Sequence, residues 1–535
     1  MPPAATRIDH LKVHSMTQTR RGFLQRVAAA GGYSAAFISM QALGLLPATS
    51  RAEPVTLEAG GGRGKKVVVL GAGISGMTAA HELRKSGYAV TLLEARARAG
   101  GRNWTIRKGS RIDLNDGSSQ TCEFDAGLYW NAGPARLPSQ HHTVLGYCRE
   151  FGIELEVEIN TSRSAMLSNP DANGGKPILL RQAVNDTRGA VSELLAKAID
   201  QGALDRELTA HDKERMIDFL KQYGDLTPEK LYKGSSRSGY SVPRGAGREA
   251  GTPNDPLPLS LLLDQELWNG VLFEDIIDQQ ATMFQPVGGM DRIPMAFAKA
   301  LGNLIHYECE VTHIGRRGEG VRIAYTHKPS GAARTLDADY CVVAMPTPVV
   351  AKIPSDFSPA YRAALAGIEW QNSVKIAWQS RRFWEQDYDI YGGISWIKGI
   401  TNMVWYPSAS LFSDQGIVLG SYSSGPNGAK LAALPLQEQF ETTRAVIERL
   451  HPGHGKELRR PMGIAWSKVP YSLGESASYR PGQVEEYDTL SQPDGPFFFC
   501  GDYLSKIGTW QESAMTSARR TINLLDARRR AVAAA

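Results

Sequence analysis

The residues whose types and spacing most clearly indicate a chemical role are those of a glycine-rich turn and one acidic residue beyond it. Gly71-Ala72-Gly73-Ile74-Ser75-Gly76 has the spacing G-x-G-x-x-G, and Glu94 lies 23 positions after Gly71. In this pattern the first glycine permits a tight turn, the second lets a pyrophosphate approach the backbone, and the third lets a helix pack closely on a strand. Glu94 can accept hydrogen bonds from a ribose. The pattern predicts a dinucleotide site, with NAD and FAD both possible at this point.

Such a turn works only between a buried strand and a helix. Residues 65–70 are a short β-branched run typical of a buried strand, and residues 77–86 are typical of a helix. Residues 88–93 predict a second strand that ends at Glu94. This is a complete βαβ unit, which makes a glycine turn without a cofactor the weaker interpretation.

The rest of the chain alternates between helical and strand-like stretches. From about 140 to 230 the pattern is helical, without a further parallel-strand signal, and residues 233–258 predict a long loop rich in Gly, Ser, Arg and Pro. Strand-like segments return at 305–326, 339–345, 372–379, 416–422 and 496–500, before a last helix from about 511. The strands of the cofactor domain are therefore expected in separated stretches.

The residues after Glu94 favour FAD. Residues 94–102, Glu-Ala-Arg-Ala-Arg-Ala-Gly-Gly-Arg, resemble the R-x-G-G-R stretch of the flavin amine oxidase superfamily. Residues 285–294 resemble the family's P-x-G-G-M stretch, and residues 308–311 resemble the strand whose valine backbone meets the adenine. Residues 497–503 and 508–514 are similar to its closing flavin motif. The resemblance spans most of the chain after residue 65.

The resemblance implies a role for each cofactor residue. Gly101 and Arg102 lie along the pyrophosphate and flavin, Trp466 lies beside the isoalloxazine, and Gly501 and Asp502 hold the ribityl and phosphate region, although Asp502 replaces the commoner glutamate. The helix that follows can point its positive end at the flavin and favour its reduced form. The expected cofactor set is Gly71, Gly73, Ser75, Gly76, Glu94, Ala95, Arg96, Gly101, Arg102, Gly133, Pro134, Ala135, Arg136, Val311, Trp466, Gly501, Asp502, Thr509 and Trp510. Residues 476–479 contain no cysteine at the position of covalent attachment, so we expect noncovalent FAD. The sequence has no C-x-x-C motif or Cys/His cluster, so we expect no metal.

The substrate class follows from Gly133-Pro134-Ala135-Arg136, which resembles the G-P-x-R segment specific to L-amino acid oxidases. In them the arginine grips the substrate carboxylate, for which a guanidinium offers two parallel donors and a permanent charge. Tyr422 aligns with a tyrosine that donates to the same carboxylate. The alternative for Arg136 is a pairing with an internal Asp or Glu, or with a flavin phosphate.

Two more residues complete the catalytic set of Arg136, Lys375, Tyr422 and Trp510. Trp510 matches an aromatic residue beside the substrate amine and flavin, but Thr509 replaces the family glycine before it, which affects the expected width of the pocket. Lys375 corresponds to a lysine that holds water near flavin N5 and is linked to dioxygen reactivity. A lysine facing inward from an apolar strand is costly unless it is hydrated or paired, which favours a functional role.

The resemblance implies oxidative deamination of an L-amino acid, with hydride transfer from Cα to flavin N5 and reoxidation by O2. A flavin monoamine oxidase or dehydrogenase, or a tryptophan 2-monooxygenase, is the alternative on the same fold. A different class is a flavin-binding electron-transfer or regulatory protein without an amine substrate. The four catalytic candidates together argue against that class.

We expect an α/β fold with a Rossmann-like FAD-binding domain built from discontinuous segments, a mixed-sheet substrate-binding domain and an inserted helical subdomain. The FAD-binding parts are expected at 53–140, 285–350 and 481–535, the helical subdomain at 141–284, and the substrate-binding domain at 351–480. A homodimer is the expected assembly.

Composition bears on location and partners. Residues 1–52 contain Arg20-Arg21 before an Ala-rich apolar stretch and end in Ser50-Arg51-Ala52, which is typical of a Tat-type signal and predicts a periplasmic or extracellular protein without stable membrane insertion. The formal net charge of +5 lies within that leader, which removes the electrostatic argument for a nucleic-acid partner. The 5 cysteines are widely spaced and are expected to be buried free thiols.

Overall fold

The computed structural model describes residues 54–480 and 483–534, so the expected leader lies outside the described residues. The first layer is a parallel sheet in the order β14-β2-β1-β18-β26. Its strands are β1 (Lys66–Leu70), β2 (Ala89–Leu93), β14 (Ile305–His306), β18 (Tyr340–Val343) and β26 (Phe497–Phe499). All neighbouring pairs run parallel. The expected Rossmann-like sheet from separated stretches of the chain is confirmed.

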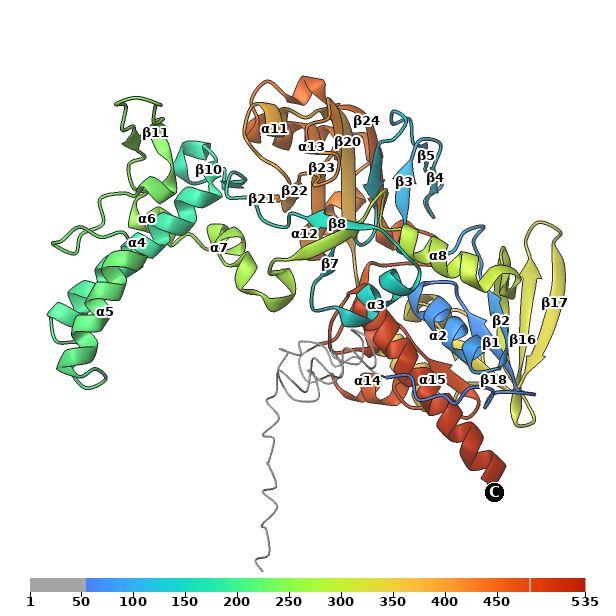
Figure 1. The fold of residues 1–535 in the computed structure, drawn as a ribbon. Coiled ribbons are helices and arrows are strands. Elements are labelled where there is room, and N and C mark those ends of the chain that lie inside the picture. The colour runs from blue at the N-terminus through green and yellow to red at the C-terminus, as the bar shows by residue number, and fades with distance from the viewer. Residues whose placement is uncertain (1–53, 481–482, 535) are drawn as a thin grey trace, which may run out of the picture. The chain divides into compact units, whose positions relative to one another are not determined.

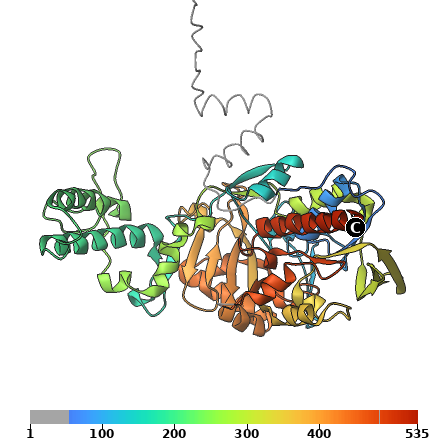
Figure 2. The same ribbon diagram turned by 90° about the horizontal axis from the view of Figure 1, so that it is seen from below.

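Two helices meet on this sheet (Figures 1 and 2). Helix α2 (Ile74–Lys85) follows β1 directly, and α15 (Gln511–Ala534), the long red helix that ends at the mark C, packs against α2. Gly76 makes the strand-to-helix turn possible, since a Cβ there would lie 2.0 Å from the carbonyl oxygen of Gly71. Gly71 has φ +99°, which a residue with a side chain rarely adopts. The structure thus requires glycine at positions 71 and 76 for the reasons that the motif predicts, a tight turn and a close approach of helix and strand.

The second layer is a mixed sheet in the order β10-β9-β21-β22-β23-β20-β24. Its strands are β9 (Met166–Ser168), β10 (Ile178–Leu179), β20 (Ser373–Arg381), β21 (Ile394–Ile397), β22 (Met403–Trp405), β23 (Gln415–Ser424) and β24 (Arg459–Ala465). Strand β20 lies between β23 and β24 and is buried along nearly its whole length. Side chains at its centre therefore face protein on both sides of the sheet.

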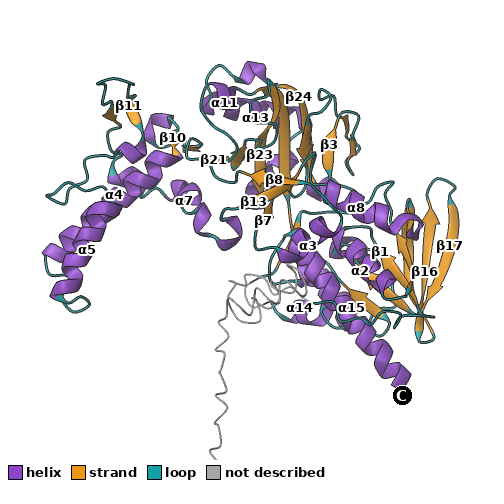
Figure 3. Cartoon of the chain, in the orientation of Figure 1, coloured by secondary structure: helices purple, strands orange, loops and turns teal. Residues whose placement is uncertain are grey.

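The segment between residues 140 and 280 is less purely helical than its pattern predicts (Figure 3). Helices α4 (Leu180–Asp200), α5 (Ala210–Tyr223), α6 (Leu259–Leu262) and α7 (Gln265–Val271) are present. However, β8 (Leu155–Glu158), β9 and β10 also arise here, and β9 pairs with β21 in parallel. These strands are only 2 to 4 residues long, too short for a periodicity to register. The expected loop at 233–258 contains a short hairpin of β11 (Tyr240–Val242) and β12 (Thr252–Pro253).

Smaller sheets complete the frame of the site. Strand β13 (Met283–Pro286) lies between β8 and β7 (Leu137–Pro138), and β15 (Cys309–Arg317), β16 (Gly320–His327) and β17 (Ala332–Ala338) form an antiparallel sheet. Three two-stranded sheets pair β3 (Thr105–Arg107) with β6 (Tyr129–Asn131), β4 (Arg111–Asp113) with β5 (Ser119–Thr121), and β19 (Glu369–Gln371) with β25 (Ser476–Ser478). The remaining helices are α3 (His142–Glu150), α8 (Arg292–Leu301), α9 (Thr347–Val350), α10 (Pro359–Gly367), α11 (Phe383–Gln386), α12 (Gly425–Ala433), α13 (Leu436–Leu450) and α14 (Glu485–Leu490).

All five cysteines are buried free thiols, as expected. Among the residues that the structure describes, no helix has both the length and the apolar character that crossing a bilayer requires.

Candidate functional site

One cavity of about 870 Å³ runs from the parallel sheet to the mixed sheet. That volume is near the upper end of the range of small-molecule and cofactor sites. Every expected cofactor and catalytic residue apart from Gly76 lines it, including Arg136, Lys375, Tyr422 and Trp510. Residues more than 400 positions apart in the chain are thus brought together, although their individual roles stay predictions.

The parallel sheet builds the dinucleotide end of the cavity. Gly73 is the N-cap of α2, which has no side-chain cap and no acidic residue in its first turn, so its N–H groups and dipole favour an anion. The two oxygens of Glu94 accept backbone N–H groups of Ala72 at 2.8 Å and of Arg96 at 2.9 Å. Each carboxylate oxygen keeps a further lone pair for a ribose hydroxyl.

The centre of the cavity contains an ion pair. Arg102 donates to both carboxylate oxygens of Asp502, one bond being 3.0 Å long, and a further guanidinium N–H reaches the carbonyl oxygen of Glu475. Gly101 lies beside Gly73 in the same wall. The shorter aspartate at position 502 is therefore anchored by Arg102. This pair lines the cavity, where the resemblance implies the ribityl and phosphate region.

The adenine end is shaped by an irregularity in β15. The register between β15 and β16 shifts between Val311 and His313, and Val311 and Thr312 both line the cavity. A bulge releases backbone groups from the ladder. Val311 is thus part of the wall at the position where the adenine contact is expected.

These observations fit FAD. The cavity offers an uncapped helix N-terminus for a pyrophosphate, a buried carboxylate for a ribose, and walls that include aromatic side chains for a flavin ring. No described atom lies within 4 Å of a Cβ built on Gly73, so the second glycine leaves open space. Trp466 is held with its Nε1 donating to the carbonyl oxygen of Ala132 at 3.0 Å, and its ring lines the cavity.

Arg136 lies at the other end, inside an aromatic cage. Its guanidinium carbon is 4.6 Å from the ring centre of Trp405, 5.6 Å from that of Phe273 and 5.7 Å from that of Trp510. One N–H donates to Asn160 Oδ1. Burial lowers the pKa of Arg136, and Glu158 partly offsets this. An arginine remains charged at any working pH, so this is a partly buried cationic site with flat apolar walls.

Tyr422 is oriented differently from the expected clamp. Its hydroxyl donates to Glu475 Oε1 at 2.7 Å, and burial together with Glu475 holds its pKa well above the usual value. A phenol has one O–H to donate. Tyr422 can bind a substrate carboxylate only if that bond is exchanged, and Glu475 was not foreseen from the sequence.

Lys375 lies inside the protein, as its sequence context predicts. It is 4% exposed, its Nζ donates to the carbonyl oxygen of Gly133 at 2.5 Å, and it lies 4.4 Å from the ring centre of Tyr422, its register partner across β20 and β23. Burial lowers the pKa of Lys375 to about 8, with Glu475 acting in the opposite direction. An ammonium held by one carbonyl keeps two N–H groups for water.

A second group of residues lines or supports the substrate end without having been recognised in the sequence: Glu158, Asn160, Gln279, Trp405 and Glu475. They come from strand ends and loops that contain no recognisable sequence motif. His141 belongs with them, because its ring meets Trp510 edge-on at 5.1 Å, and burial lowers its pKa.

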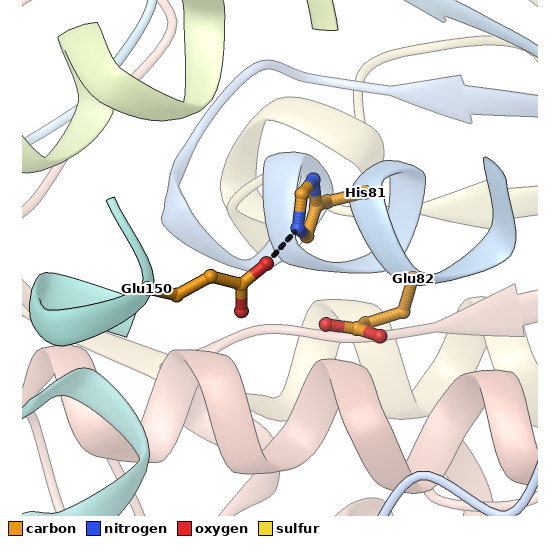
Figure 4. Close-up of side chains that lie close together, drawn as sticks. All are labelled: His81, Glu82 and Glu150. Atoms are coloured by element: carbon orange, nitrogen blue, oxygen red, sulfur yellow. Dashed lines mark hydrogen bonds and ion pairs between the residues drawn. The ribbon is translucent and has the colours of Figure 1, made fainter. Parts of the chain in front are cut away.

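Away from this cavity, His81, Glu82 and Glu150 bring three potential ligand atoms within 4.8 Å of one another (Figure 4). His81 Nε2 lies 2.8 Å from Glu150 Oε1, and Lys85 Nζ lies 3.2 Å from Glu82 and 3.6 Å from Glu150. The lysine already supplies the positive charge that a metal would bring. We interpret this cluster as a structural connection between α2 and α3.

The comparisons with known proteins agree with this architecture. Residues 74–522 match the family of flavin containing amine oxidoreductases. An L-amino-acid oxidase from Notechis scutatus scutatus is 26% identical over 478 residues, which cover 86% of this chain and 87% of that protein. A putative L-amino-acid oxidase from Bacillus subtilis (strain 168) is 26% identical over 480 residues, covering 85% of this chain and 93% of the other.

Solved structures share the fold at lower identity. Putrescine oxidase bound to putrescine superposes with a TM-score of 0.55 at 18% identity, over 87% of this chain and 99% of that one. Cyclohexylamine oxidase from Brevibacterium oxydans IH-35A gives 0.58 at 17% identity, again over 87% and 99%. The expected α/β architecture is therefore confirmed.

Proposed function

The chain belongs to the flavin containing amine oxidoreductase family, and from that premise we propose that it is an L-amino acid oxidase with noncovalently bound FAD. The reaction is R-CH(NH2)-COO⁻ + O2 + H2O → R-CO-COO⁻ + NH3 + H2O2. The relatives named L-amino-acid oxidase support this reading at about one quarter identity.

The observation that carries the proposal is Arg136 in its aromatic cage. A partly buried guanidinium enclosed by aromatic rings favours an anionic partner, and the neutral amide oxygen of Asn160 supplies an acceptor without the compensating negative charge. The rings of Trp405 and Trp510 lie against the guanidinium, so a carboxylate that binds here forms a charge-assisted bond partly shielded from bulk water. When an amine without a carboxylate binds, Arg136 gains no anionic partner from the substrate.

The chain's own contribution is to bind and orient. Arg136 fixes the carboxylate, Trp510 limits the position of the α-amino group, and the walls exclude water. Lys375 holds a proton and two free N–H groups at the junction of the cavity walls. When bound, FAD supplies the two-electron acceptor for the Cα hydride and delivers those electrons to dioxygen.

The test is a product assay on the purified holoenzyme. A panel of L-amino acids is supplied with air, and keto acid, ammonia and hydrogen peroxide are quantified. Equal amounts of keto acid and peroxide support the proposal. An amide product instead identifies a monooxygenase, and flavin reduction without peroxide identifies a dehydrogenase.

Glu475 favours a second candidate, a flavin monoamine oxidase. Its carboxylate accepts the hydrogen bond of the Tyr422 hydroxyl, which weakens the expected binding of a substrate carboxylate by Tyr422. The carboxylate also adds negative charge that suits a cationic amine. Primary amines oxidised at least as efficiently as the matching amino acids would select this alternative.

The remaining proposals concern context. We propose export through the Tat pathway, a periplasmic or extracellular location, and a homodimer. An N-terminal truncation that retains the protein in the cytoplasm, and a molar mass from light scattering, test these separately.

A further inference from the structure

A small second cavity of about 100 Å³ adjoins the substrate end of the main one. Ala135, Lys375 and Trp405 line both cavities. The volume is several times the ~10–15 Å³ that one water molecule requires. It can therefore receive the end of a flexible side chain from the main cavity.

Glu158, the last residue of β8, lines this second cavity and is 4% exposed. Among the described residues, none donates a hydrogen bond of normal geometry to either of its carboxylate oxygens. Burial raises the pKa of Glu158 to about 7, with Arg136 and Trp405 partly favouring the charged form. A buried carboxylate with open acceptor positions costs free energy until a donor satisfies it.

The other charges near this cavity are already met. Arg382 is paired with the buried Glu385, and Lys375 donates to a carbonyl with Glu475 nearby. Glu158 is the carboxylate in the described part of the second cavity whose oxygens still await donors. The carboxylate of Glu158 therefore favours a cationic hydrogen-bond donor as the group that binds in the second cavity.

We propose that the second cavity binds the cationic end of the substrate side chain, so that the preferred substrates are basic L-amino acids with an ammonium or guanidinium held by Glu158. This inference rests on the proposed function.

Charge balance gives the reason. In the free protein Arg136 and Glu158 offset one another at a distance. Once a substrate carboxylate takes Arg136, a single guanidinium faces two carboxylates, and a neutral side chain leaves one negative charge buried without a partner. A basic amino acid brings one charge of each sign, and both are paired.

The experiment compares L-lysine with L-norleucine, which has the same carbon chain without the ε-ammonium. We expect wild-type kcat/KM to favour lysine strongly and Glu158→Gln to reduce the lysine-to-norleucine ratio about 30- to 1,000-fold, as expected for loss of a buried charge partner. Glu158→Asp should restore part of the ratio. Flavin content and Tm are measured in every preparation to detect misfolding.

Glu156→Gln is the matched control. Glu156 lies on the same face of the same strand two residues earlier, but its carboxylate accepts from Gln285 Nε2 at 3.0 Å. It should leave the ratio unchanged.

The outcomes separate the two hypotheses. If norleucine is oxidised as well as lysine, or if Glu158→Gln leaves the ratio unchanged, Glu158 is a hydrated structural carboxylate and the inference is wrong while the proposed function stands. If no amino acid reduces the flavin, the proposed function fails, and the inference with it.

Discussion

Replacing Arg136 with Met separates an amino acid oxidase from an amine oxidase, because only the amino acid has a carboxylate for the guanidinium to bind. Methionine keeps an unbranched chain among Trp405, Phe273 and Trp510, whose ring centres lie 4.6–5.7 Å from the guanidinium carbon, so packing is largely preserved. The variant also releases Asn160 Oδ1.

The magnitude follows from burial. A desolvated carboxylate that loses its charged partner costs about 3–5 kcal/mol, which corresponds to a decrease in kcat/KM of roughly 10²- to 10³-fold. Loss of the aromatic contacts of Arg136 adds at most about 1–2 kcal/mol and affects any ligand equally. The first effect exceeds the second, so the loss should be selective for the carboxylate.

The assay compares the best amino acid substrate with the amine formed from it by decarboxylation. Arg136→Met should reduce kcat/KM for the amino acid by the factor above and leave the amine within a few fold. Arg136→Lys keeps the charge without the paired donors and should fall between the two. Equal losses for amino acid and amine, with FAD content retained, would refute the role of Arg136 and with it the amino acid assignment.

Three further predictions concern the cofactor, the buried lysine and the buried glutamate. Acid precipitation should release all the flavin into the supernatant, because residues 476–479 contain no cysteine, and colour that stays with the denatured chain would contradict this. Lys375→Met should slow reoxidation of the reduced flavin at least about 10-fold and should change reduction of the flavin by substrate less. The wild-type reoxidation rate should fall as the pH rises through about 8, where the ammonium of Lys375 loses its proton. Stopped-flow traces in which only flavin reduction slows would overturn the assignment. The folded protein holds the proton on Glu158 more tightly than the unfolded chain does, so the contribution of this group to stability is full below pH ~4.5 and is lost as the pH rises to about 7. The Tm advantage of Glu158→Gln over wild type should therefore grow between pH 5 and pH 8 by the equivalent of about 3 kcal/mol. A constant difference in Tm would show that the carboxylate is hydrated.

The sequence predicts those parts of the site that a backbone requirement or a motif specifies. Gly71 and Gly76 can be found because their φ angle and the close helix approach exclude a side chain. Arg136 can be found because its flanking residues form a recognisable segment. The central strands β1 and β18 of the parallel sheet can be found because both contain valine-rich apolar runs that are buried on both faces.

What the sequence does not predict lies in short or irregular segments. Strand β8 has four residues, of which only Glu158 is fully buried, so neither its strand character nor its orientation toward the site has a periodic signal. The bond between Tyr422 and Glu475 joins residues 53 positions apart, and Asn160 reaches Arg136 from beyond the end of β8. Such contacts depend on tertiary packing rather than on local pattern.

The buried cations at the substrate end each have an acidic neighbour, and this pairing limits how the site can work. Arg136 is offset by Glu158, and Lys375 by Glu475. Because each offset is incomplete, the cavity can exchange an internal partner for a substrate group without ever burying an isolated charge, which would cost several kcal/mol. A substrate carboxylate that binds Arg136 must therefore be accompanied by a change at Glu158, either a proton or a cation. A proton makes binding of neutral amino acids weaken as the pH rises through about 7. A cation makes binding of basic amino acids strengthen over the same range, because it binds the ionised form of Glu158. The pH dependence of KM for norleucine and for lysine thus distinguishes the two compensations in one enzyme.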